Sequence, residues 1–325
     1  MVKKFVYGTP FETEAVVKEI PSSEGNPDYG TFSTENGFSF TTKLADDDMV
    51  FGLGEANRGI NKRGFLYISD CADDPNHVES KTSLYAAHNF IIISGKTHVG
   101  FFFDYPGTLR FDIGYTTSDT MTVSCENADL YVYMITGDSD LDIVKQFRGI
   151  IGRSYIAPKF AFGYGQSRWG YKTEDDFRTV VKKYRENHVP LDMVYMDIDY
   201  MQDYKDFTVN EERFPDFEGF VQDMKKEKIH LVPIIDAGVK VEEGYDIYEE
   251  GCEKGYFCRR EDGSYFEATV WPGWTHFPDV LNADARKWFG DKYDVLVSKG
   301  IDAFWNDMNE PSIFYSCLLY TSPSP

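Results

Sequence analysis

Residues 191–201 read Leu-Asp-Met-Val-Tyr-Met-Asp-Ile-Asp-Tyr-Met, a mostly apolar run that ends among acidic residues. We predict a strand over residues 191–197, because a short apolar run of this length is typical of a strand that is buried on both faces. The pattern returns at residues 231–236 and 301–307, which end in Asp236 and Asp307. We therefore predict parallel strands whose carboxyl ends carry acidic side chains.

Helical patterns separate these strands. Thr173, followed three residues later by Asp176, indicates a capping box at the start of a helix. The other predicted elements are a strand at residues 160–168 and helices at residues 217–224, 245–253 and 284–298. Alternating strands and helices predict right-handed crossovers, as in the first four units of a (β/α)8 barrel or in a doubly wound sheet. Both folds place their ligands at the carboxyl ends of the strands.

The region before residue 156 shows a different pattern, with many short strands and no helices between them. Its β-branched and aromatic runs lie at residues 38–42, 66–69, 90–94, 99–104 and 121–124. Gly, Asn and Asp separate them, which is typical of a β-sandwich. We predict a β-sandwich over residues 1–155 and a partial (β/α)8 barrel over residues 156–316. Residues 317–325, CLLYTSPSP, break from this pattern and are interpreted as a foreign tail.

The composition limits the classes of partner. The chain has 325 residues, with 33 Lys and Arg against 54 Asp and Glu, and a formal net charge of −21. Such a surface repels phosphate backbones and anionic lipid, so we expect no nucleic-acid and no membrane partner. The five cysteines form no CxxC pair and the first residues show no apolar signal region, which favours a cytoplasmic protein. No metal-binding or dinucleotide-binding motif is recognised, so no cofactor is expected, and the oligomeric state stays open.

Acidic residues at the strand ends are the candidates for chemistry. Asp307 comes two residues after Trp305, and a carboxylate there could act as a nucleophile in glycoside hydrolysis. Strand alternation predicts Asp197 and Asp199 on one face, and Asp236 takes the equivalent position one unit later. Such carboxylates could bind sugar hydroxyls or a divalent metal. For any single residue, a turn cap or an ion pair with Arg or Lys is the alternative.

Tryptophans also lie at or just after the predicted strand ends. These are Trp169, Trp271 and Trp305. An indole face can stack on the apolar side of a pyranose ring, although a tryptophan can equally belong to the core. Their clustering beside carboxylates favours sugar binding.

Together these motifs resemble glycoside hydrolase family 31, the retaining α-glucosidases and their relatives. The resemblance rests on Phe-Gly-Leu-Gly-Glu (51–55), Met-Asp-Ile-Asp-Tyr-Met (196–201), Asp-Phe-Thr (206–208), Phe-Pro-Asp (277–279) and Trp-Asn-Asp-Met-Asn-Glu-Pro (305–311). With Gly-Gln-Ser-Arg-Trp-Gly (165–170), the sequence is most similar to the cytoplasmic α-glucosidases of gut Firmicutes. The family implies a galactose mutarotase-like sandwich followed by a catalytic (β/α)8 barrel.

The resemblance also implies roles for single residues. Asp307 matches the family's nucleophile, and Asp197 matches the residue that holds hydroxyls of the non-reducing-end glucose. The other matched positions of that sugar subsite are Ile198, Asp236, Trp271, Trp305 and Met308. Trp169 would lie on the first barrel loop, where the aglycone is sensed, and Asp73 on a sandwich loop that could reach over the site.

The family's acid/base aspartate has no matched position in this sequence, nor do the Arg and His that complete the subsite. Neither Glu310 nor Asp279 is assigned the role of acid. Because retaining hydrolysis needs two carboxyl groups, we expect a truncated, inactive part of an exo-acting α-glucosidase. The alternatives are a non-catalytic carbohydrate-binding protein, a relative that acts on α-xylosides or other α-glycosides, and a metal-dependent barrel enzyme. The choice between α-1,4 and α-1,6 linkages stays open.

Overall fold

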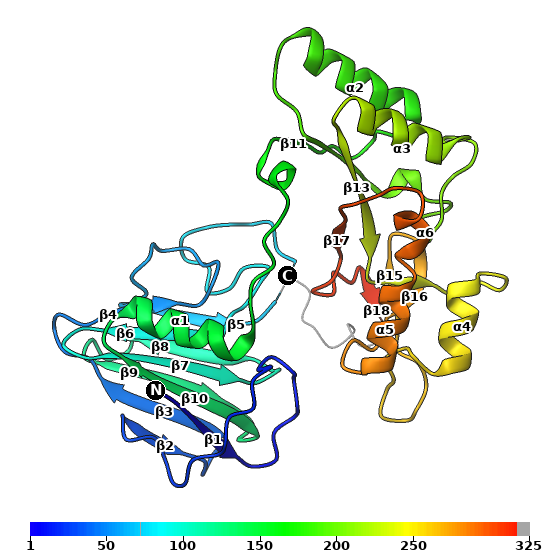
Figure 1. Ribbon diagram of the computed structural model, residues 1–325. Helices are drawn as coiled ribbons and strands as arrows, with labels where there is room; N and C mark the ends of the chain where they lie inside the picture. Colours follow the sequence, from blue (N-terminus) through cyan, green and yellow to red (C-terminus); the bar gives the residue numbers. More distant parts are fainter. Residues whose placement is uncertain (72, 317–325) are drawn as a thin grey trace. The chain divides into compact units, whose positions relative to one another are not determined.

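The computed structural model describes residues 1–71 and 73–316 (Figure 1). The chain divides into two compact units, Met1–Tyr155 and Ile156–Pro325. The predicted foreign tail, residues 317–325, lies outside the described residues, and so does Cys317. Each unit has its own hydrophobic core.

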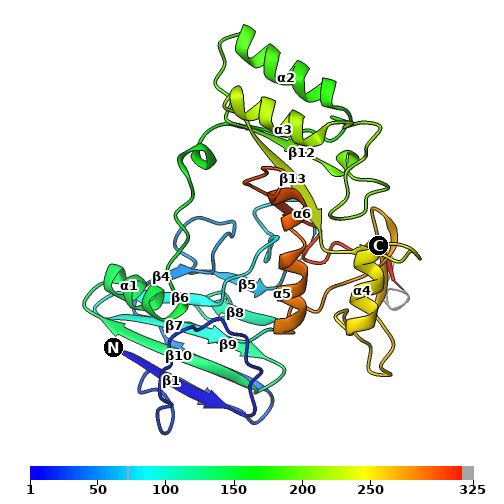
Figure 2. The same ribbon diagram turned by 45° about the vertical axis from the view of Figure 1, so that its right-hand side comes forward.

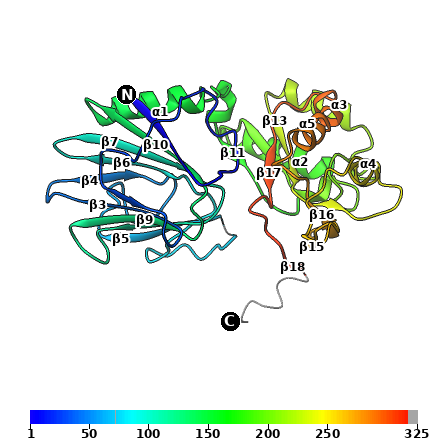
Figure 3. The same cartoon turned by 90° about the horizontal axis from the view of Figure 1, so that it is seen from below.

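The first unit is a sandwich of two five-stranded antiparallel sheets, seen as two layers in Figure 3. One sheet has the order β1-β10-β7-β6-β4 and the other the order β2-β3-β9-β8-β5. The strands are β1 (Val2–Tyr7), β2 (Thr31–Ser33), β3 (Phe38–Lys43), β4 (Met49–Gly52), β5 (Phe65–Ser69), β6 (Phe90–Ser94), β7 (His98–Asp104), β8 (Leu109–Ile113), β9 (Thr120–Cys125) and β10 (Leu130–Gly137). All five strands predicted from alternating residues are present, because the core side of each strand is apolar.

Aromatic side chains fill the space between the two sheets of the sandwich. Phe40 of one sheet lies against Phe101 of the other, with ring centroids 4.7 Å apart. Helix α1 (Asp140–Ile151) covers the outer face of the first sheet, where Ile143 and Ile150 are buried. Ser139 caps this helix by accepting the N–H of Asp142.

The second unit is built on a four-stranded parallel sheet with the order β11-β12-β13-β17. Its strands are β11 (Gly165–Gln166), β12 (Met193–Met196), β13 (His230–Asp236) and β17 (Trp305–Asp307). The helices are η1 (Lys159–Phe162), α2 (Glu174–Glu186), η2 (Ile198–Tyr200), α3 (Phe217–Lys226), α4 (Asp246–Lys254), α5 (Ala283–Asp291) and α6 (Asp294–Val297). Figure 2 shows α2 and α3 beside β12 and β13. The predicted partial barrel of parallel strands and helices is confirmed.

A second, antiparallel sheet combines three strands from the long segment between β13 and β17 with one strand that follows β17. Its order is β14-β16-β15-β18. The strands are β14 (Val239–Lys240), β15 (Glu267–Val270), β16 (Gly273–His276) and β18 (Tyr315–Ser316). This sheet was not predicted, because its strands are short and pair across loops.

Local sequence explains where the barrel helices begin and end. Thr173 and Asp176 form the predicted capping box of α2, with both reciprocal hydrogen bonds present. The helix predicted at residues 284–298 is instead two helices, α5 and α6. Between them the backbone forms hydrogen bonds of the 3-10 type: the N–H of Lys292 donates to the carbonyl of Phe289, and the N–H of Val295 donates to the carbonyl of Lys292.

The described residues also include the first predicted barrel strand and four of the cysteines. The strand predicted at residues 160–168 shrinks to β11, because Lys159–Phe162 forms a 3-10 turn instead. Among the described cysteines, Cys71, Cys125, Cys252 and Cys258 are free thiols. Within residues 1–71 and 73–316, no helix combines the length and the apolar character needed to cross a bilayer.

Candidate active site

The register of the parallel sheet brings Asp236 and Asp307 together. Asp236 is the last residue of β13, and it lies opposite Asp307, the last residue of β17. Neighbouring strands are about 4.8 Å apart, and paired residues point to the same face. Two carboxyl groups therefore stand side by side where the strands end.

Asp197 follows the end of the neighbouring strand, β12. Its Oδ1 accepts the N–H of Ile198 at 2.7 Å and so begins the turn η2. Burial, and then the charges of Asp307 and Asp199, raise the pKa of Asp197 above its ordinary value. Asp197 is thus close enough to Asp307 to sense its charge, as the strand-end prediction requires.

Asp199 does not share a strand face with Asp197, so that prediction is wrong. The chain leaves the strand at Met196 and forms a 3-10 turn, which destroys the expected alternation. Asp199 is only 1% exposed and pairs with Arg213, whose Nη1 lies 3.2 Å from Asp199 Oδ1. The alternative of an ion pair with a basic residue is confirmed for this aspartate.

Asp236 is a buried carboxyl group without a polar partner. It is 2% exposed, and neither of its carboxyl oxygens has a hydrogen-bond partner among the described residues. Burial first, and then the charges of Asp307 and Asp197, raise its pKa to about 7. A carboxyl group with two unused oxygens at a strand end is well suited to receive hydroxyl donors from a ligand.

A pocket of about 400 Å³ lies beside this pair of acids. Asp236 and Asp307 form part of its wall, together with Asn306 and Asn309. The rest is largely apolar and includes Cys258, Phe266, Phe277, Pro278, Val280 and Phe289. Its volume lies within the range of ordinary small-molecule sites, about 300–1,000 Å³. Few polar groups among apolar walls favour a ligand with both hydroxyl and C–H faces.

The neighbours of Asp307 in sequence shape the same strand end. Trp305 lies two residues before it on the same face of β17, and its ring packs edge-on against Tyr195 at 6.1 Å. Met308 follows Asp307 with a backbone φ of 58° and is buried, as is Ile198. A left-handed backbone at a residue other than glycine is uncommon and concentrates at functional sites.

The profile of the glycosyl hydrolases family 31 TIM-barrel domain matches residues 154–323, which is more than half of the chain. The chain belongs to glycosyl hydrolase family 31. The profile of the glycosyl hydrolase 31 N-terminal galactose mutarotase-like domain matches residues 11–112 in addition. The family predicted from the sequence motifs is therefore confirmed.

This family 31 chain is similar to several alpha-glucosidases over part of their length. It is 37% identical to alpha-glucosidase 2 of Bacillus thermoamyloliquefaciens, over 84% of this chain and 35% of that protein. It is 28% identical to the alpha-glucosidase of Saccharolobus solfataricus, over 96% of this chain and 46% of that protein. The crystal structure of a family 31 alpha-glucosidase from Bacteroides thetaiotaomicron matches with a TM-score of 0.78 and 26% identity, over 87% of this chain and 48% of that chain. The chain thus spans less than half the length of these relatives.

Of the other two tryptophans predicted near strand ends, Trp169 follows a parallel strand of this family 31 chain and Trp271 does not. Trp271 lies in the hairpin turn between β15 and β16, not at the end of a parallel strand. It is 46% exposed and packs edge-on against Phe314. Trp169 is 66% exposed in a turn after β11, at the opposite edge of the parallel sheet from β17. Contact of Trp169 or Trp271 with a sugar stays a prediction.

Asp73 lies in the loop between β5 and β6 of the first unit. Its predicted reach over the site stays a prediction. In the part of the chain that the structure describes, no group of three or more His, Cys, Asp or Glu side chains could hold a metal ion.

Sequence reasoning missed the role of Asp206. This residue belongs to the Asp-Phe-Thr motif at residues 206–208, but the motif does not indicate that the Asp206 side chain is buried. Its Oδ1 accepts the backbone N–H of Asp236 at 2.9 Å. The signal available was an acid placed directly before an aromatic residue, Phe207, which is itself buried.

Proposed function

We propose that this chain is the part of a retaining, exo-acting α-glucosidase that binds the terminal glucose and supplies the nucleophile. The observation that carries the proposal is the pairing of Asp236 and Asp307 at the ends of adjacent strands, with Asp197 close by. Two relatives that are named alpha-glucosidases support the substrate class. Hydrolysis of α-linked oligosaccharides by the whole protein is part of the same proposal.

Asp307 would attack the anomeric carbon of the terminal glucose. The bond between that carbon and the glycosidic oxygen breaks, and an ester bond to Asp307 forms. Water later attacks the same carbon, releases the ester and gives α-glucose, so that two inversions produce net retention. Negative charges on Asp307 and Asp197 favour the positive charge that develops on the sugar ring.

The residues around the nucleophile would hold the sugar. Asp197 would accept hydrogen bonds from glucose hydroxyls, and Asp236 would do the same from the neighbouring strand. Trp305, Ile198 and Met308 would supply the apolar walls of this subsite, which suits the C–H faces of a pyranose ring. Trp271 and Trp169 are proposed as further wall and aglycone contacts.

A retaining glycosidase also needs an acid that protonates the leaving oxygen, about 5–5.5 Å from the nucleophile. We assign no carboxyl group of this chain to that role. We therefore propose that the 325-residue chain does not hydrolyse unactivated glycosides by itself. The cytoplasmic location, the similarity to enzymes of gut Firmicutes and the preferred linkage stay predictions.

α-Glucosyl fluoride tests the nucleophile without the missing acid, because fluoride leaves without being protonated. The chain should release fluoride in a burst that approaches one equivalent. Asp307→Asn should abolish the burst, whereas Asp302→Asn should keep it. Asp302 lies just before the same strand and pairs with His230, at the end away from the pocket. A full burst from the Asp307→Asn variant would show that another group is the nucleophile.

Saturable glucose binding without any fluoride burst would favour the alternative, a non-catalytic carbohydrate-binding protein. Calorimetry on the wild-type chain with glucose and with xylose separates the two sugars. Preference for xylose would redirect the proposal to α-xylosides.

A further inference from the structure

The end of β13 extends beyond its neighbour β12. Met196, the last residue of β12, lies opposite Pro233, so Asp236 stands three residues past the end of that pairing. Its backbone N–H therefore has no acceptor from β12. Asp206 Oδ1 takes that place at 2.9 Å, so a side chain continues the ladder where the strand stops.

Among the described residues, no basic side chain forms an ion pair with Asp206. It is 1% exposed, and its Oδ2 has no hydrogen-bond partner among the described residues. The titratable groups that face it are Asp236 of β13, Tyr200 of η2, Tyr245 before α4 and Tyr293 between α5 and α6. Burial first, and then the charge of Asp236, raise the pKa of Asp206 well above its ordinary value.

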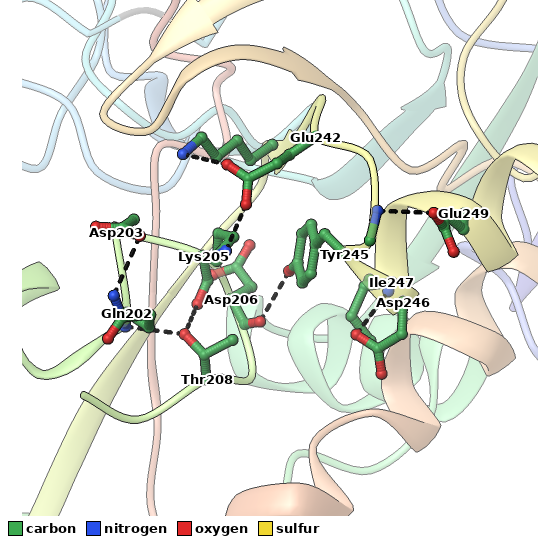
Figure 4. Close-up of polar contacts among 12 residues, drawn as sticks. Gln202, Asp203, Lys205, Asp206, Thr208, Glu242, Tyr245, Asp246, Ile247 and Glu249 are labelled. Atoms are coloured by element: carbon green, nitrogen blue, oxygen red, sulfur yellow. Dashed lines mark hydrogen bonds and ion pairs between the residues drawn. The ribbon is translucent and has the colours of Figure 1, made fainter. Parts of the chain in front are cut away.

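Residues before and after Asp206 in its loop form polar contacts, as Figure 4 shows. Lys205 Nζ lies 2.6 Å from Glu242 Oε1, and Lys240 Nζ lies 2.6 Å from Glu242 Oε2. The Thr208 hydroxyl donates to the Lys205 carbonyl at 2.6 Å. The ammonium group next to Asp206 in the sequence, that of Lys205, thus pairs with Glu242, and no described residue forms an ion pair with Asp206.

The backbone of Asp206 is fastened as well. The Tyr245 hydroxyl donates to the Asp206 carbonyl at 2.8 Å (Figure 4). Phe207 packs edge-on against Phe289 and Tyr293, at 5.1 Å and 5.3 Å. These contacts hold the loop against the segments before α4 and around α5, and so restrict the position of Asp206.

We propose that Asp206 is a positioning residue: in its neutral form it holds the end of β13 so that Asp236 stays beside Asp307. The proposal deepens the proposed function and rests on it only where it concerns glucose. The hydrogen bond to Asp236 needs an acceptor oxygen but no charge. A negative charge on Asp206 would instead repel Asp236 and disturb the pair of strand-end acids.

Nuclear magnetic resonance of the chain labelled with carbon-13 at the aspartate carboxyl groups tests this directly. The Asp236 signal is assigned by its loss in Asp236→Asn, and its titration midpoint is expected near the value of about 7. Asp206→Asn keeps a neutral acceptor oxygen, so it should leave that midpoint and the exchange rate of the Asp236 amide unchanged. Asp206→Ala removes the acceptor, so the amide should exchange at least about tenfold faster and the midpoint should fall.

Asp203→Asn is the matched control, because it removes a carboxylate from the same loop, one that accepts a hydrogen bond from the Gln202 side chain and does not contact Asp236 in the described part of the chain. It should leave both readings unchanged. A fall of the Asp236 midpoint in Asp206→Asn would show that Asp206 is charged and would overturn the proposal. Unchanged readings in a folded Asp206→Ala would overturn it too.

Should Asp206→Ala fail to fold, Asp206→Asn alone decides by its midpoint and its amide exchange. Glucose binding, measured by calorimetry on the same proteins, separates the two proposals. A chain that shows the expected Asp236 titration but binds no glucose would contradict the proposed function and leave the positioning role standing.

Discussion

Asp236 lies directly opposite Asp307 in the parallel pairing of β13 and β17. Both carboxyl groups line the pocket, and that of Asp236 is deeply buried with no hydrogen-bond partner in residues 1–71 and 73–316. Such a pair is costly to keep in a folded protein, because like charges repel and burial removes water. The proposed binding of sugar hydroxyl groups would explain why the two acids stand together.

The unfolding free energy should fall as the pH rises from 4 to 8. The folded pKa of Asp236 is about 7, above its ordinary value of 3.8, so the folded state binds the extra proton between these values. The stabilisation from this bound proton is complete below pH 4 and is lost as the pH rises through 7. The loss amounts to on the order of 4 kcal/mol of unfolding free energy. Urea unfolding at pH 4 and pH 8 measures this difference.

Asp236→Asn is the matching variant, because the asparagine side chain has nearly the same shape as aspartate but does not titrate. It should have a flatter stability profile and be more stable than the wild type at pH 8. Equal slopes for the two proteins would contradict the raised pKa.

Replacing Arg213 by Met should destabilise the chain by roughly 1–3 kcal/mol, because it leaves the buried Asp199 carboxylate without its partner. Lys287→Met breaks an exposed pair with Asp291 and should cost less than about 0.5 kcal/mol. Urea unfolding of both variants makes the comparison. Similar losses would show that the Asp199 pair contributes no more than a surface pair.

Asp197→Asn should weaken glucose binding by about tenfold or more, since a charged acceptor is replaced by a neutral one. Asp199, two residues away, is occupied by Arg213 and is expected to affect stability, not affinity. Calorimetry with Asp197→Asn and Asp199→Asn, each at a temperature where it is folded, tests this division. Equal losses of affinity would mean that both acids contact the sugar.

Thr173→Ala should destabilise α2 and lower the unfolding free energy by about 1 kcal/mol, because it removes one half of the capping box. Thr179→Ala, at an exposed position inside the same helix, should be neutral or slightly stabilising, since alanine is the better helix former. Thermal unfolding of both variants is the measurement. A loss of the same size at both positions would argue against the cap.

Much of the fold could be predicted, because periodicity reports which face of an element is buried. The apolar stripe of Phe217, Phe220 and Met224 and the alternation in β3 gave the correct elements. Acids after apolar runs also pointed to Asp236 and Asp307. Their direct pairing depends on the register between β13 and β17, in which each residue pairs with the one 71 positions later, and no local pattern contains this register.

What could not be predicted depends on tertiary contacts. Asp199 turned away from Asp197 because a 3-10 turn replaced the last part of the strand. Trp271 lies in a hairpin of a second sheet, whose strand pairing is not local. Asp206 looked like any polar loop residue until its burial and its bond to Asp236 were known.

The site of covalent labelling by 5-fluoro-α-glucosyl fluoride tests the central claim most directly. Its fluoride leaves without an acid, and the fluorine at C5 slows the later attack by water, so the ester accumulates. We predict one label per chain, found by peptide mass spectrometry on Asp307 and absent from Asp307→Asn. Labelling of a different carboxylate would contradict the assignment of the nucleophile, and so would a chain that binds glucose but remains unlabelled.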